Sequence, residues 1–457
     1  MIKALQDRYP FIVSVVYSGD GLTRAELLAG VQAKFGLEIS PRTVHVVELR
    51  RRPWVDRRYP RLTLLLQSLG SMWLAAEALH ELRPDVFIDT VGYAFSYPLV
   101  RMVCGERVPV VSYTHYPTIS SDMQTLVASR ESGVSNSSAI ASSPLLTLLK
   151  RMYYWLFAHA YAWSGSFAAT IMVNSSWTHA HVVQLFGKPR MTRVVYPPCD
   201  TEALADLPLT GRHQLVVSLA QFRAEKNHAL QVDAFAQMLA QHPEMTAPEG
   251  WRKPQESALL SGESEYPVLV VLGGARNLED EARAEELRLQ AKRLKIDRQV
   301  HVVVNAAWPR VREWLAASSV GLHTMRDEHF GIGVVEMMAA GLLTVAHDSA
   351  GPKLDIITPA VRCSADGKAP EMPDPDECAP GEYPVGMLAT TADEFAQMIG
   401  LALAATGDAP DAMRRAAREA ATTRFSEDVF CTAFHRRFDP VVRWLDNQRS
   451  DADESYE

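Results

Sequence analysis

The chain has 457 residues, 47% of them hydrophobic and 22% charged, which is the composition of a soluble globular protein with two or three domains. Its formal net charge of -8 argues against bulk attraction to nucleic acid. The 5 cysteines lie far apart and form no CxxC pair, which argues against a disulfide framework and for a reducing compartment.

The first half of the chain alternates apolar, β-rich runs with helical stretches. Helices are expected over 21–36 and 177–187, with Asn174 and Ser175 as candidate N-terminal caps of the second and Gly187 as its C-terminal cap. Strands are expected within the runs 11–20, 42–49, 84–92, 108–117, 169–176 and 192–200.

The first ten residues, MIKALQDRYP, have the pattern of a helix end. A doubly wound domain normally begins with a strand and a glycine-rich turn before its first helix. We therefore expect that this strand and turn are absent, and that the sequence is a truncated form of a longer protein.

The second half repeats the alternation, which predicts a second parallel sheet covered by helices. Surface insertions are expected at 242–267 and 364–384, where Pro, Gly, Ser and Glu are frequent. Strands are expected within 213–222, 266–275, 298–307, 318–325, 341–351 and 385–390. The predicted fold is therefore α/β, with two doubly wound, Rossmann-like domains. The predicted parts are an incomplete N-terminal domain (1–205), a C-terminal domain (206–425), a helix (426–446) and a disordered acidic tail (447–457).

Two segments combine basic and aromatic residues with apolar runs. The stretch 50–74 contains 6 arginines ahead of an apolar run, and 145–163 places Lys150 and Arg151 within an apolar, ring-rich sequence. Neither has the uninterrupted apolar length of a membrane span. Contact with an anionic bilayer surface and burial as inter-domain helices both account for this pattern.

The run DEHFGIGVVEMMAAG (327–341) follows an expected strand and opens an expected helix. Gly331 and Gly333 allow the backbone to approach an anion, which the helix N-terminus attracts. Glu328 lies in the preceding loop and Glu336 in the first turns of the helix, so the two carboxylates address different parts of a ligand. Since a carboxylate accepts two hydroxyl donors, the diols of a sugar and of a ribose are suitable partners.

The spacing of Glu328 and Glu336 around the Gly-x-Gly resembles the donor-site signature of retaining glycosyltransferases with the GT-B fold, in the family numbered four. The stretch SLAQFRAEKNHALQVDAF resembles the family's segment in which two basic residues neutralise the donor diphosphate. Lys226 falls on the family's lysine, whereas its usual arginine position holds Gln221, with Arg223 two residues later. Cations suit this place because the departing nucleoside diphosphate gains negative charge in the transition state.

SYTHYPTISSDM narrows the resemblance to the α-1,2-mannosyltransferases of dolichol-linked N-glycan precursor assembly. The similarity extends from Tyr9 to about Arg437, apart from the two insertions. His115 matches the family's active-site histidine, which contacts the transferring sugar, and Asp122 belongs to the same motif without an assigned role. Near its N-terminus the family also has a membrane span and a glycine-rich turn, neither of which is found in this sequence.

The resemblance implies GDP-mannose as donor and a dolichol-diphosphate-linked oligosaccharide as acceptor of the fourth and fifth mannoses, at the cytosolic face of the endoplasmic reticulum membrane. Glu328 would hold mannose hydroxyls, Glu336 the ribose, and Arg223 with Lys226 the phosphates. The donor-binding segment comprises Gln221, Phe330, Gly331, Ile332, Gly333 and Glu336.

The resemblance implies neither a metal nor a cofactor, and other mannosyltransferases are possible partners besides the membrane surface. Guanine-binding residues are not assigned beyond a location near Asn305. Two alternatives remain: a non-catalytic scaffold for membrane-bound mannosyltransferases, and another hexosyltransferase of the same fold, of which a soluble enzyme for a storage sugar is disfavoured by the SYTHYPTISSDM motif.

Overall fold

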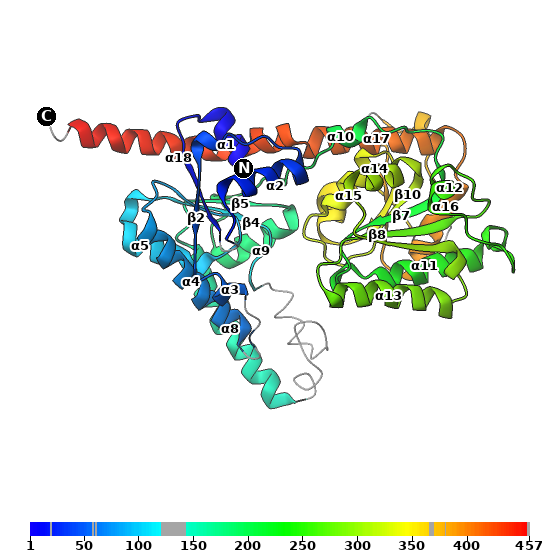
Figure 1. Ribbon diagram of the computed structural model, residues 1–457, viewed down its shortest axis with the longest axis horizontal. Helices are drawn as coiled ribbons and strands as arrows, with labels where there is room; N and C mark the ends of the chain where they lie inside the picture. The colour runs from blue at the N-terminus through cyan, green and yellow to red at the C-terminus, as the bar shows by residue number, and fades with distance from the viewer. Residues whose placement is uncertain are drawn as a thin grey trace. The chain divides into compact units, whose positions relative to one another are not determined.

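The computed structural model describes residues 1–18, 21–56, 59, 62–119, 143–364, 370–379 and 381–454. The chain forms two compact units (Figure 1). Unit 1 comprises Met1–Val195 together with Cys431–Glu457, and unit 2 comprises Tyr196–Phe430. Asp122 lies outside the described residues, so the structure gives no account of it.

Unit 1 contains two parallel sheets in its described part. The first two strands pair only with each other, and the other four form a sheet in sequence order. No pairing between described residues joins these two sheets. The strands are β1 (Ser14–Ser18), β2 (Val44–Glu48), β3 (Phe87–Asp89), β4 (Val110–Thr114), β5 (Thr170–Val173) and β6 (Thr192–Val194).

The helices of unit 1 pack around a core that includes Tyr97, Tyr161 and Ile171. Their bounds are α1 (Ile2–Arg8), α2 (Arg24–Phe35), α3 (Pro53–Asp56), α4 (Thr63–Glu81), α5 (Tyr97–Cys104), α8 (Pro144–Gly165), α9 (Ser176–Phe186) and α18 (Glu427–Glu454). Helix α9 has the predicted caps Ser175 and Gly187, the latter with the left-handed φ of 64°, whereas Asn174 lies one residue outside the cap.

Helix α18 brings the end of the chain back to its beginning. Asp439 bonds to Arg8 and to the hydroxyl of Tyr9, and His435 to the carbonyl of Ala4. The sequence predicts that this helix ends at residue 446, but it continues to Glu454. The residues DNQRSDADE contain no Gly or Pro, so nothing in their backbone chemistry ends the helix earlier.

Unit 2 is built on one sheet of seven strands, in the order β12-β13-β11-β10-β7-β8-β9, and all its described pairings are parallel. The doubly wound α/β fold predicted for this half is confirmed. The strands are β7 (His213–Leu219), β8 (Val268–Gly273), β9 (Val300–Val304), β10 (Ser318–His323), β11 (Leu343–His347), β12 (Val361–Arg362) and β13 (Met387–Ala389).

Helices cover both faces of this sheet and produce two cores. Alternate residues of β7 belong to different cores: Leu215 and Val217 lie with Trp314 and Val216 with Phe235. This burial on both faces explains why the strands read as continuous apolar runs. The helices are α10 (Glu202–Ala205), α11 (His228–Gln241), α12 (Glu256–Leu260), α13 (Leu278–Arg293), α14 (Trp308–Ala317), α15 (Ile332–Ala339), α16 (Ala392–Ala404) and α17 (Asp408–Phe425). Helix α12 lies in the first predicted insertion.

Candidate functional site

Glu328 is the centre of a charged cluster at the carboxyl end of the unit 2 sheet. It follows β10 in the loop before α15, and its side chain is 12% exposed. Its Oε2 atom accepts from Lys226 Nζ and lies 3.1 Å from His323 Nε2. No described residue bonds to Oε1, which is therefore available to a ligand hydroxyl.

The charge state of Glu328 follows from these neighbours. Burial by itself would raise the pKa of this carboxyl. The hydrogen bond and charge of His323, together with the charge of Lys226, outweigh burial and lower the pKa to about 2. Glu328 is therefore an anion at neutral pH, held in one orientation by two partners.

Lys226 is positioned by a neighbouring loop. It ends a short 3₁₀ turn, and Asn227 next to it has a left-handed φ of 50°. The hydroxyl of Thr324, just past β10, donates to the carbonyls of Lys226 (3.2 Å) and Asn227 (3.0 Å). Since an ammonium has three donors and Glu328 uses one of them, Lys226 has donors left for an anion.

The N-terminus of α15 lies beside this cluster. Gly331 caps the helix with a φ of 112°, and Val334 bonds back to its carbonyl. A Cβ on Gly333 would come within 2.9 Å of the Leu219 carbonyl oxygen, so only glycine allows this helix start to approach β7. The first N–H groups of a helix have no partners within it, which makes this end suitable for a phosphate.

Glu336, one turn further along α15, lines a pocket of about 460 Å³, a size typical of ligand sites. Burial, and secondarily the charge of Asp200, raises the pKa of Glu336 to about 7. The other lining residues come from the ends of β7, β8 and β9 and from α14: Leu219, Ala220, Gln221, Leu272, Gly273, Gly274, Asn305, Ala306, Trp308 and Val311.

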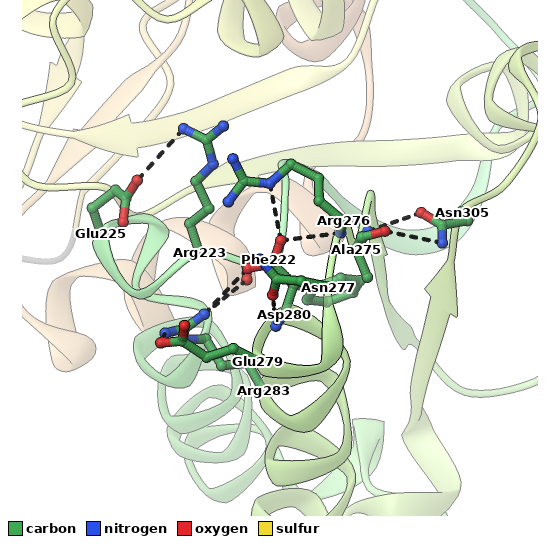
Figure 2. A network of polar contacts seen from close by, with 10 residues as sticks. All are labelled: Phe222, Arg223, Glu225, Ala275, Arg276, Asn277, Glu279, Asp280, Arg283 and Asn305. Carbon is green, nitrogen blue, oxygen red and sulfur yellow. Dashed lines mark hydrogen bonds and ion pairs between the residues drawn. The ribbon is translucent and has the colours of Figure 1, made fainter. Parts of the chain in front are cut away.

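A polar network holds the loops at one side of this pocket (Figure 2). The side chain of Asn305 bonds to both the N–H and the carbonyl of Ala275, at 2.8 and 3.2 Å. The buried carboxylate of Asp280 accepts from Arg276 and Arg283, at 3.0 and 3.3 Å. These contacts fix the loop between β8 and α13, and they occupy the Asn305 amide that the sequence placed near the guanine.

Among the described residues, no hydrogen bond or ion pair joins Arg223 to Glu328 or Glu336. Its guanidinium pairs with Glu225 at 3.8 Å, and its Nε is buried without a hydrogen-bond partner among the described residues. In Figure 2 the side chain extends away from Asn305 and the α13 helix. Of the two predicted cations, only Lys226 therefore contacts Glu328.

The remaining donor-segment residues differ in what they can offer a ligand. Phe330 is 3% exposed and packs between Tyr196 and Phe425, with ring centroids 5.7 and 5.5 Å away, so its ring is not open to a donor. Ile332 is 44% exposed at the first turn of α15. Gln221 lines the same pocket as Glu336.

His115 lies in unit 1, directly after β4, as predicted. Its ring is edge-on to Tyr113 at 4.9 Å, and its carbonyl accepts from Thr178 at 3.3 Å. Desolvation lowers the pKa of His115, although the charge of Asp89 opposes this. The pairing of Thr114 with Val173 places Asn174 next to His115 in register, and the buried Oδ1 of Asn174 has no hydrogen-bond partner among the residues that the structure describes.

Sequence reasoning missed several residues of these sites. His323 lies inside a strand pattern that indicates only a core position, and Asn174 was interpreted as a cap. The buried Asp89, which accepts from Val91, Gly92 and Tyr97 at 2.6 to 3.0 Å, ends β3 in a short FIDTVG run. Polar residues at strand ends were the available signal for all three.

Two features are absent from the residues that the structure describes. These residues contain no group of three or more His, Cys, Asp or Glu side chains arranged to hold a metal ion. None of the described helices combines the length and the hydropathy that crossing a bilayer requires.

Comparison with protein families finds two matches along the chain. Residues 1–186 match the family described as ALG11 mannosyltransferase N-terminus, and residues 200–372 match glycosyl transferases group 1.

Curated proteins match over nearly the whole chain. A GDP-Man:Man(3)GlcNAc(2)-PP-Dol alpha-1,2-mannosyltransferase of Mus musculus is 40% identical over 439 residues, which cover 95% of this chain and 81% of the relative. The protein of the same name from Homo sapiens is 38% identical over the same shares of the two chains.

Solved structures agree on the fold. Anabaena HepE in complex with UDP and glucose superposes with a TM-score of 0.58 at 16% identity, covering 96% of this chain and 94% of that one. An α,α-trehalose 6-phosphate synthase from Burkholderia multivorans gives 0.55 at 16% identity, covering 88% and 86%. The GT-B fold class predicted from the sequence is confirmed.

Proposed function

Because the chain belongs to the family of GDP-Man:Man(3)GlcNAc(2)-PP-Dol alpha-1,2-mannosyltransferases, we propose that it transfers mannose from GDP-mannose to a dolichol-diphosphate-linked oligomannose in α-1,2 linkage. The observation that carries this proposal in the structure is the cluster of Glu328, Lys226 and the α15 N-terminus, next to the pocket that Glu336 lines.

The donor is proposed to lie along this edge of unit 2. Glu328 accepts from mannose hydroxyls, since its Oε1 is open and its pKa of about 2 keeps it ionised. The amides at Gly331 to Gly333 and the ammonium of Lys226 hold the diphosphate. Glu336 accepts from the ribose hydroxyls, and the nucleoside occupies the pocket between Gln221 and Trp308.

Arg223 is proposed to act on the phosphates only after its side chain leaves Glu225, a surface partner 3.8 Å away. Such an exposed pair is weak, so a diphosphate competes for the guanidinium easily. The role of His115, contact with the transferring sugar, rests on the sequence resemblance and on its place at the end of β4. Asp122 keeps its membership of the motif without a role.

We propose that the reaction retains the configuration of the anomeric carbon by front-face attack. The acceptor hydroxyl approaches on the side from which GDP leaves. The bond between the anomeric carbon and the acceptor oxygen forms as the bond to the phosphate oxygen breaks, and the hydroxyl proton passes to the departing diphosphate. Lys226 and the helix N-terminus stabilise the charge that develops there. No protein nucleophile and no metal ion is assigned.

The proposed location is the cytosolic face of the endoplasmic reticulum membrane, where the lipid-linked acceptor and GDP-mannose would meet. Other mannosyltransferases of the same assembly are proposed as possible partners. In the alternative, a scaffold without catalysis, the ionised and oriented Glu328 would have no use.

The test incubates the chain with GDP-mannose and an oligomannose acceptor on a short isoprenoid diphosphate, followed by mass and anomer analysis of the product. We expect one or two α-linked mannoses to be added. Glu328→Gln should lower kcat by about two orders of magnitude, since it removes an interaction with the reacting sugar.

The matched control is Glu285→Gln on the exposed face of α13, which should behave like the wild type. GDP binding, measured by calorimetry, should survive in both variants. Failure of the wild type to lengthen the acceptor while it binds GDP, or normal turnover of Glu328→Gln, contradicts the proposal.

A further inference from the structure

A second cavity lies on unit 2, outside the site described above. Its volume is about 400 Å³, which is within the range of ligand sites, and none of its lining residues lines the pocket of Glu336. The cavity is called the β9 edge site below. Its lining comes from the first insertion, the C-terminal half of α13, the turn that follows and β9: Lys253, Arg288, Ala291, Asp297, Val300, His301 and Val302.

β9 is an edge strand of the unit 2 sheet. Within the described part of the chain it pairs with β8 alone. Asn305, which directly follows β9, donates its N–H to the carbonyl of Gly273 in β8 at 2.8 Å. Because the N–H and C=O groups of successive residues point to alternate sides of a strand, those of Val300 and Val302 point away from β8. The N–H of Val302 therefore has no neighbouring strand among the described residues to accept it.

Two cations cover the outward carbonyls of this edge. Lys253 Nζ donates to the carbonyl of Val300 at 2.9 Å, and Arg288 Nη2 donates to that of Val302 at 3.0 Å. Arg288 also donates from Nη1 to Glu285 at 3.0 Å. Since an ammonium has three N–H groups and a guanidinium five, both cations have donors left. The N–H of Val302 lies between the two carbonyls along the strand, and thus between the two cations that bind them.

The insertion that carries Lys253 is held on the sheet edge by Gln299, which is 2% exposed. The side chain of Gln299 accepts from the N–H of Ala247 at 2.8 Å. It also donates to the carbonyls of Met245 and Pro267, at 3.0 and 2.9 Å. Both ends of the insertion are therefore bound to the residue that precedes β9, so Lys253 belongs to a fixed segment and its position is set before any ligand binds.

The side chains of the β9 edge site favour an anion. Desolvation lowers the pKa of Lys253, and the charge of Asp297 opposes this effect whereas that of Arg288 adds to it. Asp297 is exposed, so solvent screens its charge. The Nε2 atom of His301 is buried without a hydrogen-bond partner among the described residues, and Glu256 lies 3.8 Å from it. An anion between the two cations would give the half-buried ammonium the partner that burial requires.

We propose that the β9 edge site binds a small phosphate monoester. The phosphoryl oxygens accept from the ammonium of Lys253, the guanidinium of Arg288 and the N–H of Val302. A phosphoryl dianion matches the two cations, and its three terminal oxygens match the three kinds of donor. A phosphate ion fills only part of a cavity of about 400 Å³, so the wall at Ala291 and His301 is left for the organic part of the ligand. This ligand is separate from the GDP-mannose of the proposed function.

The test is equilibrium dialysis of the full chain against radiolabelled glycerol 3-phosphate, with GDP at about ten times its Kd to fill the donor site. The wild type should bind one monoester per chain. Inorganic phosphate should displace the label, whereas succinate at the same concentration should not. Arg288→Gln and Lys253→Gln should each weaken binding about tenfold or more, because each removes a charge-assisted contact to the phosphoryl group.

The matched controls are Arg293→Gln and Lys292→Gln, which remove the same charges from exposed positions of α13 outside the cavity. Both should bind glycerol 3-phosphate like the wild type. The side chain of Arg288 is 45% exposed, so Arg288→Gln should keep the wild-type melting temperature and decides the test even where Lys253→Gln does not fold.

Four results would overturn the proposal. They are a wild type that binds no monoester, equal displacement by succinate and by phosphate, wild-type binding in Arg288→Gln, and equal weakening in Arg288→Gln and Arg293→Gln. The last result would mean that the general charge of α13, and not a site at the β9 edge, attracts the ligand.

Discussion

Glu328 and Glu336 are both glutamates and lie eight positions apart, but the structure shifts their pKa values in opposite directions. His323 and Lys226 lower the pKa of Glu328 against the effect of burial, whereas Glu336 has no such partner among the described residues and burial raises its pKa. The folded state thus stabilises the anion of Glu328, whereas ionisation of Glu336 lowers the free energy of unfolding. A ligand with hydroxyl donors would stabilise the buried anion of Glu336. This is expected of a residue that serves binding at the expense of stability.

The cost at Glu336 predicts a pH-dependent gain of stability in Glu336→Gln. The folded pKa is about 7 against 4.5 for the free side chain, so the native state loses stability as pH rises between these values. At pH 8 the variant should therefore have a free energy of unfolding up to about 3 kcal/mol larger than the wild type, and a higher melting temperature. Near pH 4 the two proteins should melt at the same temperature.

Glu328→Gln provides the opposite sign in the same experiment. The folded pKa of Glu328 is lowered to about 2 from 4.5, so its contribution is present above 4.5 and lost as pH falls towards 2. This variant should be less stable than the wild type at pH 8. If both variants shift stability in the same direction at pH 8, the assigned environments of the two carboxylates are wrong.

Between elements, the site depends on loops held by their neighbours across the sheet. The N–H of Gly351, beyond β11, bonds to the carbonyl of Glu328 at 2.9 Å, and that of Asp327 to Ser349 at 2.8 Å. On the other side Thr324 holds the backbone at Lys226. The loop that carries Glu328 follows β10 and is thus held by the segments that follow β7 and β11. Its orientation is set before any ligand binds.

Gly333→Ala tests how closely α15 must approach β7. The new Cβ would lie 2.9 Å from the backbone oxygen of Leu219, which cannot move without shifting the end of the strand. We expect GDP to bind about tenfold more weakly and the protein to lose about 1–3 kcal/mol of stability. Isothermal titration and thermal melting measure the two effects.

Gly30→Ala in α2 is the control of the same chemistry. A Cβ there meets nothing within 4 Å, and alanine favours a helix by up to about 1 kcal/mol. That variant should be as stable as the wild type or more so, with unchanged GDP binding. If both alanines behave alike, the close approach at Gly333 has no consequence for the site.

The sequence predicts the strands and the Gly-x-Gly helix start of unit 2 because these features are local. Apolar runs indicate buried parallel strands, and a glycine pair after a strand indicates an anion site. The partnership of Lys226 with Glu328 joins residues 102 positions apart, and the sequence reaches it only through family resemblance. Other features depend on packing between elements, for which no local pattern exists. These are the position of Arg223, the burial of the Phe330 ring and the two hydrogen bonds between Asn305 and Ala275.

For the whole molecule, the path of the chain is the main physical feature. Unit 2 interrupts unit 1, which is completed by the last helix. Phe438 of that helix is 2% exposed and packs on Phe434 and Tyr9, with ring centroids 5.4 and 5.7 Å away. Residues from both ends of the sequence therefore share one part of the unit 1 core, and unit 2 has cores of its own.

Separate cores predict two thermal transitions that respond to different changes. Phe438→Ala should lower the transition temperature of unit 1, because loss of a buried aromatic ring reduces the unfolding free energy by about 3–5 kcal/mol. GDP at a hundredfold excess over its Kd should raise the transition temperature of unit 2, because it adds about 2.7 kcal/mol to the unfolding free energy of that unit. Phe235→Ala, in a unit 2 core, should lower the transition that GDP raises. Calorimetry of the three samples decides the matter: a single transition that moves with every change would mean that the two units unfold as one, in spite of their separate cores.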